Sequence, residues 1–193
     1  MTDARQYEQN LVCFQTLGKA RPASLQACRE TGGYEVWERI LAGGMTREQV
    51  IDGVKASGLR GRGGAGFPTG VKWTFMPKDA PGQKYVVCNA DEGDSGTFSD
   101  RMLMEGDPLC LIEGMIIAGL AVGATRGYIY LRCEYPHAGH ALREAIEAAR
   151  VRGYLGPDVC GSGKSFELEV RMGAGAYICG EESALLESLQ GKL

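Results

Sequence analysis

The residues from Gly58 to Gly70 are the part of this chain whose composition is best suited to binding a ligand. Six of these thirteen residues are glycine and two are arginine. Glycine lets the backbone adopt positive φ and approach a ligand closely. Successive backbone N–H groups in such turns form an anion-binding concavity, and Arg60, Arg62 and the nearby Lys72 add positive charge. The segment therefore predicts a loop that binds a phosphate-bearing cofactor.

Within this loop, Gly61–Gly66 matches the pattern G-x-G-x-x-G, which also marks dinucleotide-binding folds. That fingerprint requires an apolar strand before the glycines and a helix at the last one. The preceding residues, Thr46–Ser57, instead predict a helix with a capping box formed by Thr46 and Gln49. Pro68 follows the glycines almost at once, and no apolar helix opens there. A standard Rossmann site is therefore disfavoured and stays a third, weaker alternative.

Other patterns that could bind phosphate or a metal are incomplete. Gly161–Ser165 lacks the first glycine of a P-loop, because Asp158 stands in its place and a strand follows, so we predict a turn. His137 and His140 have only Glu134 near them, which is too few ligands for a metal. The seven cysteines are at least 15 positions apart and form no C-x-x-C pair, so no metal site is predicted. We expect nearly all of them to be small core residues of a reduced, cytoplasmic protein.

The composition excludes several classes of partner. The chain has 193 residues, 44% of them hydrophobic and 23% charged, and a formal net charge of −3. This charge gives no reason to expect nucleic acid or an anionic membrane as a partner. The longest apolar run, Met115–Ala124, is too short to span a bilayer. Met1–Phe14 is mixed polar and does not resemble a secretion signal.

Helical and extended patterns alternate along the chain. Met1–Gly33 is weakly patterned, and we expect it to be irregular. The expected helices are Tyr34–Leu41, Thr46–Ser57, Asp107–Gly123, His137–Arg152 and Glu181–Gln190, and the expected strands are Lys84–Asn89, Tyr128–Leu131 and Phe166–Val170. This alternation predicts an α/β fold with a largely parallel sheet and flanking helices. Ligands bind beyond the carboxyl ends of such strands, where we expect the glycine loop, Asn89–Asp94 and Gly173–Glu182 to meet.

Polar side chains at these positions could hold a heterocycle and its hydroxyl groups. Asn89 can both donate and accept, and the carboxylates of Asp91 and Glu92 accept from hydroxyls and amines. A solvated turn would explain the same residues equally well. Glu181 and Glu182 begin a helix, where the helix dipole alone would favour carboxylates.

Three aromatic residues lie in or beside the glycine-rich loops. Tyr177 stands in a loop made otherwise of small residues, so it could stack on a planar ring. Phe67 and Phe75 flank the first loop in the same way. Packing against the core is an equally good explanation for Phe75 and a weaker one for Phe67.

Taken together, these segments resemble a known family, the flavoprotein subunit shared by respiratory complex I, NAD-reducing hydrogenases and NAD-dependent formate dehydrogenases. Three long motifs occur in the family's order: Gly58–Phe75, Cys88–Phe98 and Gly173–Ser183. The residues Asp91–Gly96 and Asp100–Asp107 look most like the formate dehydrogenase beta subunit.

The resemblance implies a modified Rossmann-like FMN-binding domain over residues 34–193, with NADH stacked on the flavin. The residues that it assigns to FMN are Gly61, Arg62, Gly63, Lys72, Asn89, Asp91, Glu92, Tyr177, Gly180 and Glu181. Those that it assigns to NADH are Phe67, Phe75, Asp94 and Glu182. Some complex I relatives have Glu where this chain has Asp94, and the shorter side chain would alter that contact.

The resemblance also implies parts that this sequence does not contain. Family members continue into a ubiquitin-like domain and a helical domain whose cysteines bind a 4Fe–4S cluster, so we expect the FMN/NADH-binding domain here to be incomplete at its C-terminal end. The implied partners are a 2Fe–2S thioredoxin-like subunit and a formate-oxidising or hydrogenase subunit. The expected activity is NADH dehydrogenase (diaphorase) chemistry. A non-catalytic nucleotide-binding or assembly fragment is the alternative.

Overall fold

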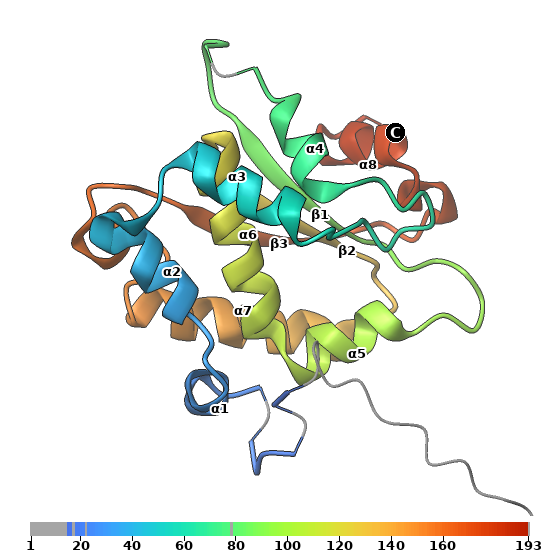
Figure 1. Cartoon of the computed structure of the whole chain (residues 1–193). Coiled ribbons are helices and arrows are strands. Elements are labelled where there is room, and N and C mark those ends of the chain that lie inside the picture. The colour runs from blue at the N-terminus through green and yellow to red at the C-terminus, as the bar shows by residue number, and fades with distance from the viewer. Residues whose placement is uncertain (1–14, 17, 22, 78, 193) are drawn as a thin grey trace, which may run out of the picture.

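The protein is an α/β domain around a three-stranded sheet, shown by a computed structural model in Figure 1. The structure describes residues 15–16, 18–21, 23–77 and 79–192. Strands β1 (Tyr85–Ala90), β2 (Arg126–Leu131) and β3 (Glu167–Met172) lie in that order, and both neighbouring pairs are parallel. The predicted α/β fold with a parallel sheet is confirmed.

Helices α6 (Pro108–Val122) and α7 (Pro136–Val151) cover one face of the sheet. A Cβ at Gly127 of β2 would stand 3.3 Å from the methyl carbon of Met115 in α6. A Cβ at Gly139 of α7 would stand 3.3 Å from Leu131 at the end of β2. These two glycines let the helices approach this face, where most of the buried core lies.

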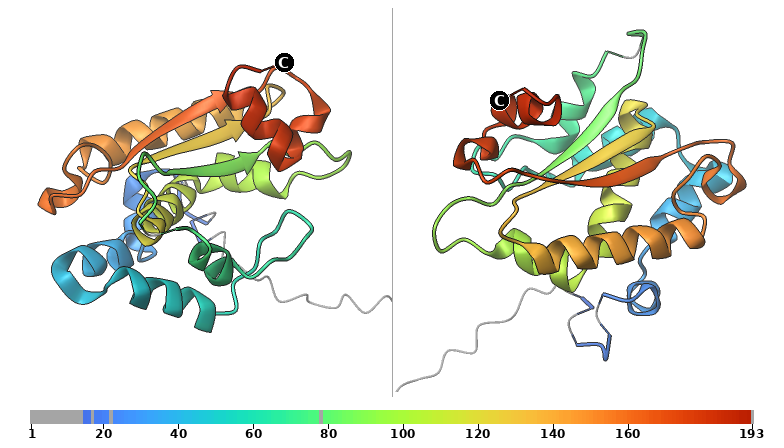
Figure 2. Two further views of the ribbon diagram at one scale, coloured as in Figure 1. Left: turned by 90° about the horizontal axis from the view of Figure 1, so that it is seen from above. Right: turned by 180° about the vertical axis from the view of Figure 1, so that it is seen from behind.

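Helix α8 (Glu182–Leu189) lies on the opposite face of the sheet, as Figures 1 and 2 show. There the hydroxyl groups of Tyr130 and Ser188 are 2.9 Å apart. Tyr130, Cys179 and Leu185 form a small buried cluster beneath the helix. The last helix is therefore fixed beside the carboxyl end of the central strand.

Local capping signals place two helices as predicted. Helix α3 (Arg47–Ala56) begins with the complete capping box, in which the Thr46 amide donates to Gln49 Oε1 at 2.7 Å. Helix α6 begins at Pro108, with Asp107 accepting a 3.3 Å hydrogen bond from the Cys110 amide. It ends at Gly123, whose φ of 74° favours glycine.

Three short helices were not predicted. Helix α1 (Leu25–Glu30) lies in the segment that we expected to be irregular, and Ser24 caps it by accepting from the Ala27 amide. Helix α4 (Thr69–Thr74) follows Pro68 directly, and α5 (Ser99–Gly106) precedes α6. Each has six to eight residues, which is too few for an apolar period to stand out. Residues 1–14, 17 and 22 of the first segment lie outside the described residues.

The remaining elements are close to their predicted ranges. The helix expected at Tyr34–Leu41 is divided into α2 (Glu35–Arg39) and a π-helical turn, η1 (Ile40–Gly44). The turn at Gly161–Ser165 is confirmed, because a short 3₁₀ turn, η2 (Val159–Gly161), leads there into β3. Another 3₁₀ turn, η3 (Tyr177–Gly180), precedes α8.

The cysteines are less buried than we predicted. Of the six in the described part of the chain, Cys28 and Cys179 are buried, but Cys110, Cys133 and Cys160 are exposed. Burial raises the pKa of the Cys28 thiol to about 12, with neighbouring carboxylates adding to the effect. The prediction that nearly all cysteines are core residues is therefore wrong for the three exposed positions.

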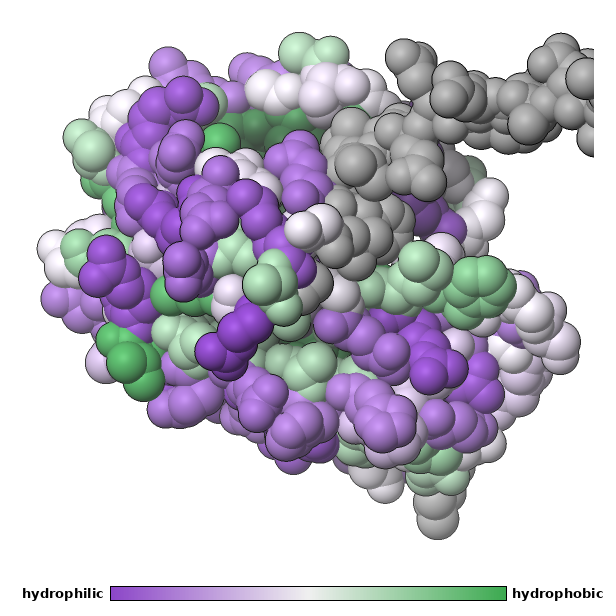
Figure 3. All heavy atoms as spheres, turned by 90° about the horizontal axis from the view of Figure 1, so that it is seen from below, coloured by the Kyte–Doolittle hydropathy of each residue, from purple (hydrophilic) through white to green (hydrophobic). Residues whose placement is uncertain are grey.

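No helix within the described ranges has the length and apolar character needed to cross a membrane. Figure 3 shows one face of the molecule, seen from below, on which hydrophilic residues predominate and hydrophobic residues are scattered between them.

Candidate functional site

The second and third predicted segments meet at the carboxyl end of β1. The Asn89 side chain donates a 2.8 Å hydrogen bond from Nδ2 to the carbonyl oxygen of Gly180, 91 positions later in the chain. Its Oδ1 accepts from the Asp91 amide at 3.2 Å. One amide side chain therefore links the acidic segment after β1 to the glycine-rich segment before α8.

A second link joins the same two segments. The Tyr177 hydroxyl donates to Asp94 Oδ1 at 2.7 Å. The Tyr177 ring lies over Gly93, where a Cβ would stand 3.1 Å from the ring. Because Gly93 has no side chain, the tyrosine can approach the backbone closely while 70% of it stays exposed.

The glycine loop lies at the same end of the molecule, as Figures 1 and 2 show. Its base is closed by two hydrogen bonds, from the Gly61 amide to the Phe67 carbonyl and from the Thr69 amide to the Leu59 carbonyl, each 2.9 Å long. Among the described residues, the amides of 62–66 have no hydrogen-bond acceptor. Gly64 and Gly66 have φ values of 101° and 59°. The loop thus presents free donors that an anion could accept.

Positive charge accompanies these free amides. Arg62 is exposed in the loop, and Lys72 lies on the helix that follows it. Lys72 Nζ is 3.9 Å from Glu182 Oε2 at the start of α8, and both side chains are largely exposed. This ion pair connects the first predicted segment with the third, although such an exposed pair adds little to stability.

The carboxylate of Asp91 has one oxygen atom that no group in the described part of the chain satisfies. Its Oδ2 is buried and has no hydrogen-bond partner among the described residues. Burial raises the pKa of this carboxyl above its ordinary value, and Arg132 opposes that shift. An unpaired buried oxygen is unfavourable, so a ligand hydroxyl that donates to it would stabilise the site. The site therefore fits a polyhydroxylated group such as the ribityl chain of FMN.

Two other predicted carboxylates bond to the protein itself. Glu92 is only 7% exposed, and its oxygens accept from the Asp100 and Arg101 amides at 2.9 and 3.1 Å. Glu181 caps α8 by accepting from the amides of Ser183 and Ala184, which lowers its pKa. The prediction that Glu92 holds a ligand group receives no support from this geometry, because its carboxylate caps α5 instead.

Phe67 and Phe75 form a pair beside the glycine loop. Their ring centroids are 6.0 Å apart with an interplanar angle of 55°. The residues are 45% and 68% exposed, so they are not core anchors. An exposed aromatic pair at the rim of a site is suited to stacking on a planar ligand.

Sequence reasoning missed the residues directly after β2. Arg132 and Tyr135 lie beneath the acidic segment, and Tyr135 donates to Glu92 Oε2 at 3.1 Å. Their place after the central strand of a parallel sheet was the available signal. Among the described residues, no three His, Cys, Asp or Glu side chains gather as a metal site would require.

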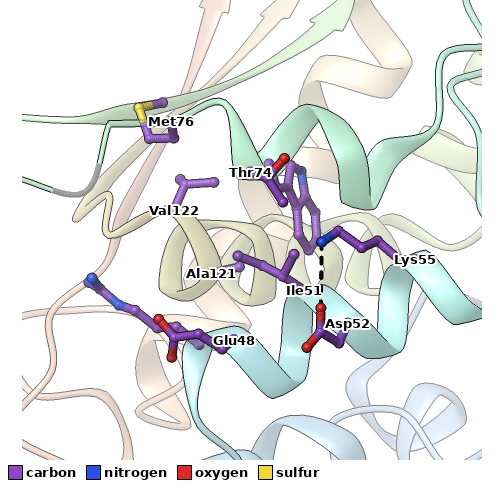
Figure 4. Close-up of a pocket in the computed structure, with 10 residues that line it drawn as sticks. Glu48, Ile51, Asp52, Lys55, Thr74, Met76, Ala121 and Val122 are labelled. Atoms are coloured by element: carbon purple, nitrogen blue, oxygen red, sulfur yellow. Dashed lines mark hydrogen bonds and ion pairs between the residues drawn. The ribbon is translucent and has the colours of Figure 1, made fainter.

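Two cavities occur away from this site. One, of about 250 Å³, lies between α3, α4 and α6 and is lined by Ile51, Trp73 and the Lys55–Asp52 pair (Figure 4). The other, of about 240 Å³, lies beside Trp37 and Phe166. The first reaches Ala121 and Val122 at the end of α6, and the second reaches the residues 123–125 that lead from α6 into β2. Both therefore lie toward the end of the sheet where β2 begins, opposite the predicted site.

The parallel sheet and the polar groups at its carboxyl end define an α/β cofactor-binding domain. The family model described as the Nuo51 FMN-binding domain matches residues 54–193. The chain belongs to this family, and the recognition of a modified Rossmann-like flavoprotein domain is confirmed.

Curated relatives come from respiratory and hydrogenase complexes. A subunit of the NADH-quinone oxidoreductase of Aquifex aeolicus is 53% identical over 174 residues, which cover 90% of this chain and 40% of that protein. The HndC subunit of the NADP-reducing hydrogenase of Solidesulfovibrio fructosivorans is 49% identical over 181 residues, covering 94% of this chain and 36% of that one. The chain spans about two fifths of the length of these relatives.

Among solved structures, the NAD+-reducing NiFe-hydrogenase in its H2-reduced state is similar. The match has a TM-score of 0.67 and 44% identity, and it covers 76% of this chain and 24% of that one. At 44% identity, the two chains are related in sequence as well as in fold.

Proposed function

We propose that this chain binds FMN and NADH together, as the hydride-exchanging diaphorase module of a multisubunit oxidoreductase. The supporting observation is the convergence of three distant segments on one end of the sheet, with free loop amides and an unpartnered Asp91 oxygen at the meeting place. When bound, FMN supplies the hydride-accepting centre and the exchange of single electrons with iron–sulfur clusters.

The glycine loop would hold the FMN phosphate. The amides of residues 62–66 are free to donate, and Arg62 and Lys72 add charge that stabilises an anion. The exposed Lys72–Glu182 pair is weak enough for Lys72 to exchange its partner for a phosphate oxygen. Gly61 and Gly63 would let the phosphate approach the backbone.

The acidic segment and the loop before α8 would hold the rest of the flavin. Asp91 Oδ2 would accept from a ribityl hydroxyl, and Asn89 fixes the position of Gly180 beside it. Tyr177 would cover one edge of the ring system, and the capped Glu181 would line the pocket.

NADH would enter over the exposed aromatic pair. Phe67 and Phe75 would stack on its adenine, while Asp94 and Glu182 would accept from its hydroxyl groups. No side chain of the protein needs to act as an acid or base in the hydride step, because that chemistry belongs to the cofactors. The protein would fix the geometry in which the two cofactors stack.

The finer assignment concerns the complex in which the module works. The sequence of Asp91–Gly96 and Asp100–Asp107 favours a formate dehydrogenase, with a 2Fe–2S thioredoxin-like subunit and a formate-oxidising subunit as partners in the cytoplasm. A hydrogenase subunit is the other candidate partner. Formate-dependent NAD+ reduction by a complex that co-purifies with this chain from its own cell would support the formate assignment, and hydrogen-dependent reduction would contradict it.

Titration of the purified chain with FMN and then NADH tests the activity. We expect FMN to bind in the micromolar range with quenching of its fluorescence, and anaerobic NADH to bleach the bound flavin. NADH binding without FMN binding would favour the non-catalytic alternative. Binding of neither would contradict the proposal.

A further inference from the structure

The segment Asp91–Phe98 has no secondary structure of its own in its first half, yet it bears three of the carboxylates that the sequence analysis assigned to ligands, those of Asp91, Glu92 and Asp94. Glycine occurs at positions 93 and 96, and Gly96 has a φ of 82°. Such a segment keeps one conformation only if neighbouring elements hold it. The structure shows which residues do so.

Glu92 is the anchor of this segment. Besides the two α5 amides, its carboxylate accepts from Ser99 Oγ at 3.2 Å and from Tyr135 Oη at 3.1 Å. It therefore accepts four hydrogen bonds at a position that is only 7% exposed. A buried carboxylate of this kind is stable only while its donors stay in place.

Arg132 also binds Glu92, by a hydrogen bond to the main-chain carbonyl group of Glu92. Its Nη1 donates to the carbonyl oxygen of Glu92, and its own amide donates to the Ala90 carbonyl at 3.3 Å. Arg132 directly follows β2, so it extends the β1–β2 pairing by one step and then reaches under the acidic segment. Its Nε is bonded to Glu134 at 3.1 Å, which fixes the plane of the guanidinium group.

The Tyr135 ring connects the two arginines near this anchor. The guanidinium carbons of Arg132 and Arg101 lie 5.1 and 5.5 Å from its centroid. Both distances are within the range of cation–π attraction. Burial and the Glu92 carboxylate raise the pKa of Tyr135, so its hydroxyl keeps the proton that it donates. Tyr135 thus contacts the carboxylate by its hydroxyl and the two cations by its ring.

We propose that Arg132 and Tyr135 are positioning residues for the flavin site: they fix Glu92, and through it the places of Asp91 and Asp94. This inference rests on the proposed function, because it concerns the same site. The pair acts on the site through the segment between Ala90 and Phe98, to which it is hydrogen-bonded.

The chain offers a matched control for the hydroxyl of Tyr135. Tyr154 also donates from a buried ring to a glutamate, with 2.9 Å between its Oη and Glu38 Oε1, but it lies in the core next to Tyr34 and away from the site. Tyr135→Phe and Tyr154→Phe each remove one such hydrogen bond. If the two variants differ in hydrogen exchange or FMN binding at the site, the difference arises from where the hydrogen bond lies and not from a general loss of stability.

Two measurements test the positioning role. The first is amide hydrogen exchange of residues 91–98 in the ligand-free chain, where we expect Tyr135→Phe to speed exchange about tenfold and Tyr154→Phe to leave it unchanged. The tenfold figure corresponds to the loss of about one hydrogen bond to a charged acceptor. Equal exchange in the two variants would overturn the inference, whatever the chain binds.

The second measurement uses FMN as the probe. We expect Tyr135→Phe to raise the FMN dissociation constant about tenfold and to change the visible circular dichroism of the saturated flavin, while Tyr154→Phe changes neither. Arg132→Lys keeps the charge but loses the planar fork, so it should behave like Tyr135→Phe. Wild-type dissociation constant and spectrum in both site variants would overturn the inference. Absence of FMN binding by the wild-type chain would instead contradict the proposed function, and the exchange measurement would still decide the positioning role.

Discussion

The Tyr177 hydroxyl lies 2.7 Å from Asp94 Oδ1, across a sequence separation of 83 residues. The sequence assigned these residues to different ligands, Tyr177 to the flavin and Asp94 to NADH. In the structure they bond to each other, so one hydrogen bond couples the two halves of the proposed site.

This coupling predicts that either residue affects both ligands. Tyr177→Phe should raise the FMN dissociation constant and the KM for NADH by about threefold each, the typical result of losing one hydrogen bond. Asp94→Asn, combined with Tyr177→Phe, should add little to the single change. Fully additive effects in this double-mutant cycle would show that the pair is not coupled.

The glycine loop predicts a substitution that spares the fold and weakens ligand binding. A Cβ at Gly63 would meet no atom within 4 Å, so Gly63→Ala should fold normally. It should nevertheless weaken FMN binding by about tenfold or more, because the added methyl group keeps the phosphate from the loop amides. Gly53→Ala, in the exposed interior of α3, is the control and should raise stability by about 1 kcal/mol with unchanged FMN affinity. Unchanged FMN affinity in Gly63→Ala would exclude the loop as the phosphate site.

Asn89 is predicted to hold the site together through its amide. In Asn89→Asp the donor that faces the Gly180 carbonyl becomes an acceptor, and FMN affinity should fall about tenfold. Gln83→Glu is the matched control, because it also removes an amide donor, here one bonded to Thr125 at 2.9 Å outside the site. Fluorescence titration compares the two, and equal losses of affinity would point to a general effect on stability.

The exposed aromatic pair predicts an effect confined to NADH. Phe75→Leu should change the free energy of unfolding by less than about 0.5 kcal/mol, since the side chain is largely exposed. It should raise the KM for NADH about three- to tenfold, because that change corresponds to the binding free energy of one aromatic stacking contact. The kcat should change little. Tyr85→Leu, on the open part of the sheet, should leave the KM unchanged. A lower kcat at an unaltered KM would place Phe75 in another role.

Asp107 predicts a pH dependence of folding. Burial raises the pKa of its carboxyl above the unfolded value, with the cap hydrogen bond from Cys110 opposing the shift. The folded chain therefore binds more protons than the unfolded chain between pH 3.8 and the raised pKa, and stability from this group falls as pH rises through that window.

Two variants separate the charge of Asp107 from its capping role. Asp107→Asn keeps an acceptor for the helix cap and should remove this part of the pH dependence without loss of stability at pH near 7. Asp107→Ala should be about 1 kcal/mol less stable than Asp107→Asn at every pH, because both variants lack the titrating carboxyl and differ only in the cap. Thermal unfolding across acidic pH provides the measurement, and an unchanged pH profile in Asp107→Asn would refute the assignment.

The features that the sequence predicted correctly depend on residues close together along the chain. The capping box of Thr46 and Gln49 and the cap of Asp107 are complete within three positions, so the helix starts were readable. The parallel sheet followed from alternating patterns. The short helices α4 and α5 were missed because six to eight residues do not show a period.

The contacts that shape the site could not be read in this way. Whether a carboxylate faces a ligand or a helix depends on elements far away in the chain, and the partner of Glu92 in Tyr135 is 43 residues away. The same holds for Lys72 and Glu182, which meet across 110 positions of sequence, from residue 72 to residue 182. Motifs therefore identified the segments, and only the tertiary structure distinguished a carboxylate bonded within the protein, such as Glu92, from one with an oxygen left unpaired by the described residues, such as Asp91.

Hydrogen exchange of the wild-type chain with and without FMN shows whether the three distant segments form one flavin site. FMN should slow exchange together in residues 61–66, 89–92 and 177–182, and leave exchange around the cavity between α3, α4 and α6 unchanged. Protection of only one of the three segments, or protection around Trp73 instead, would show that they do not form a common site.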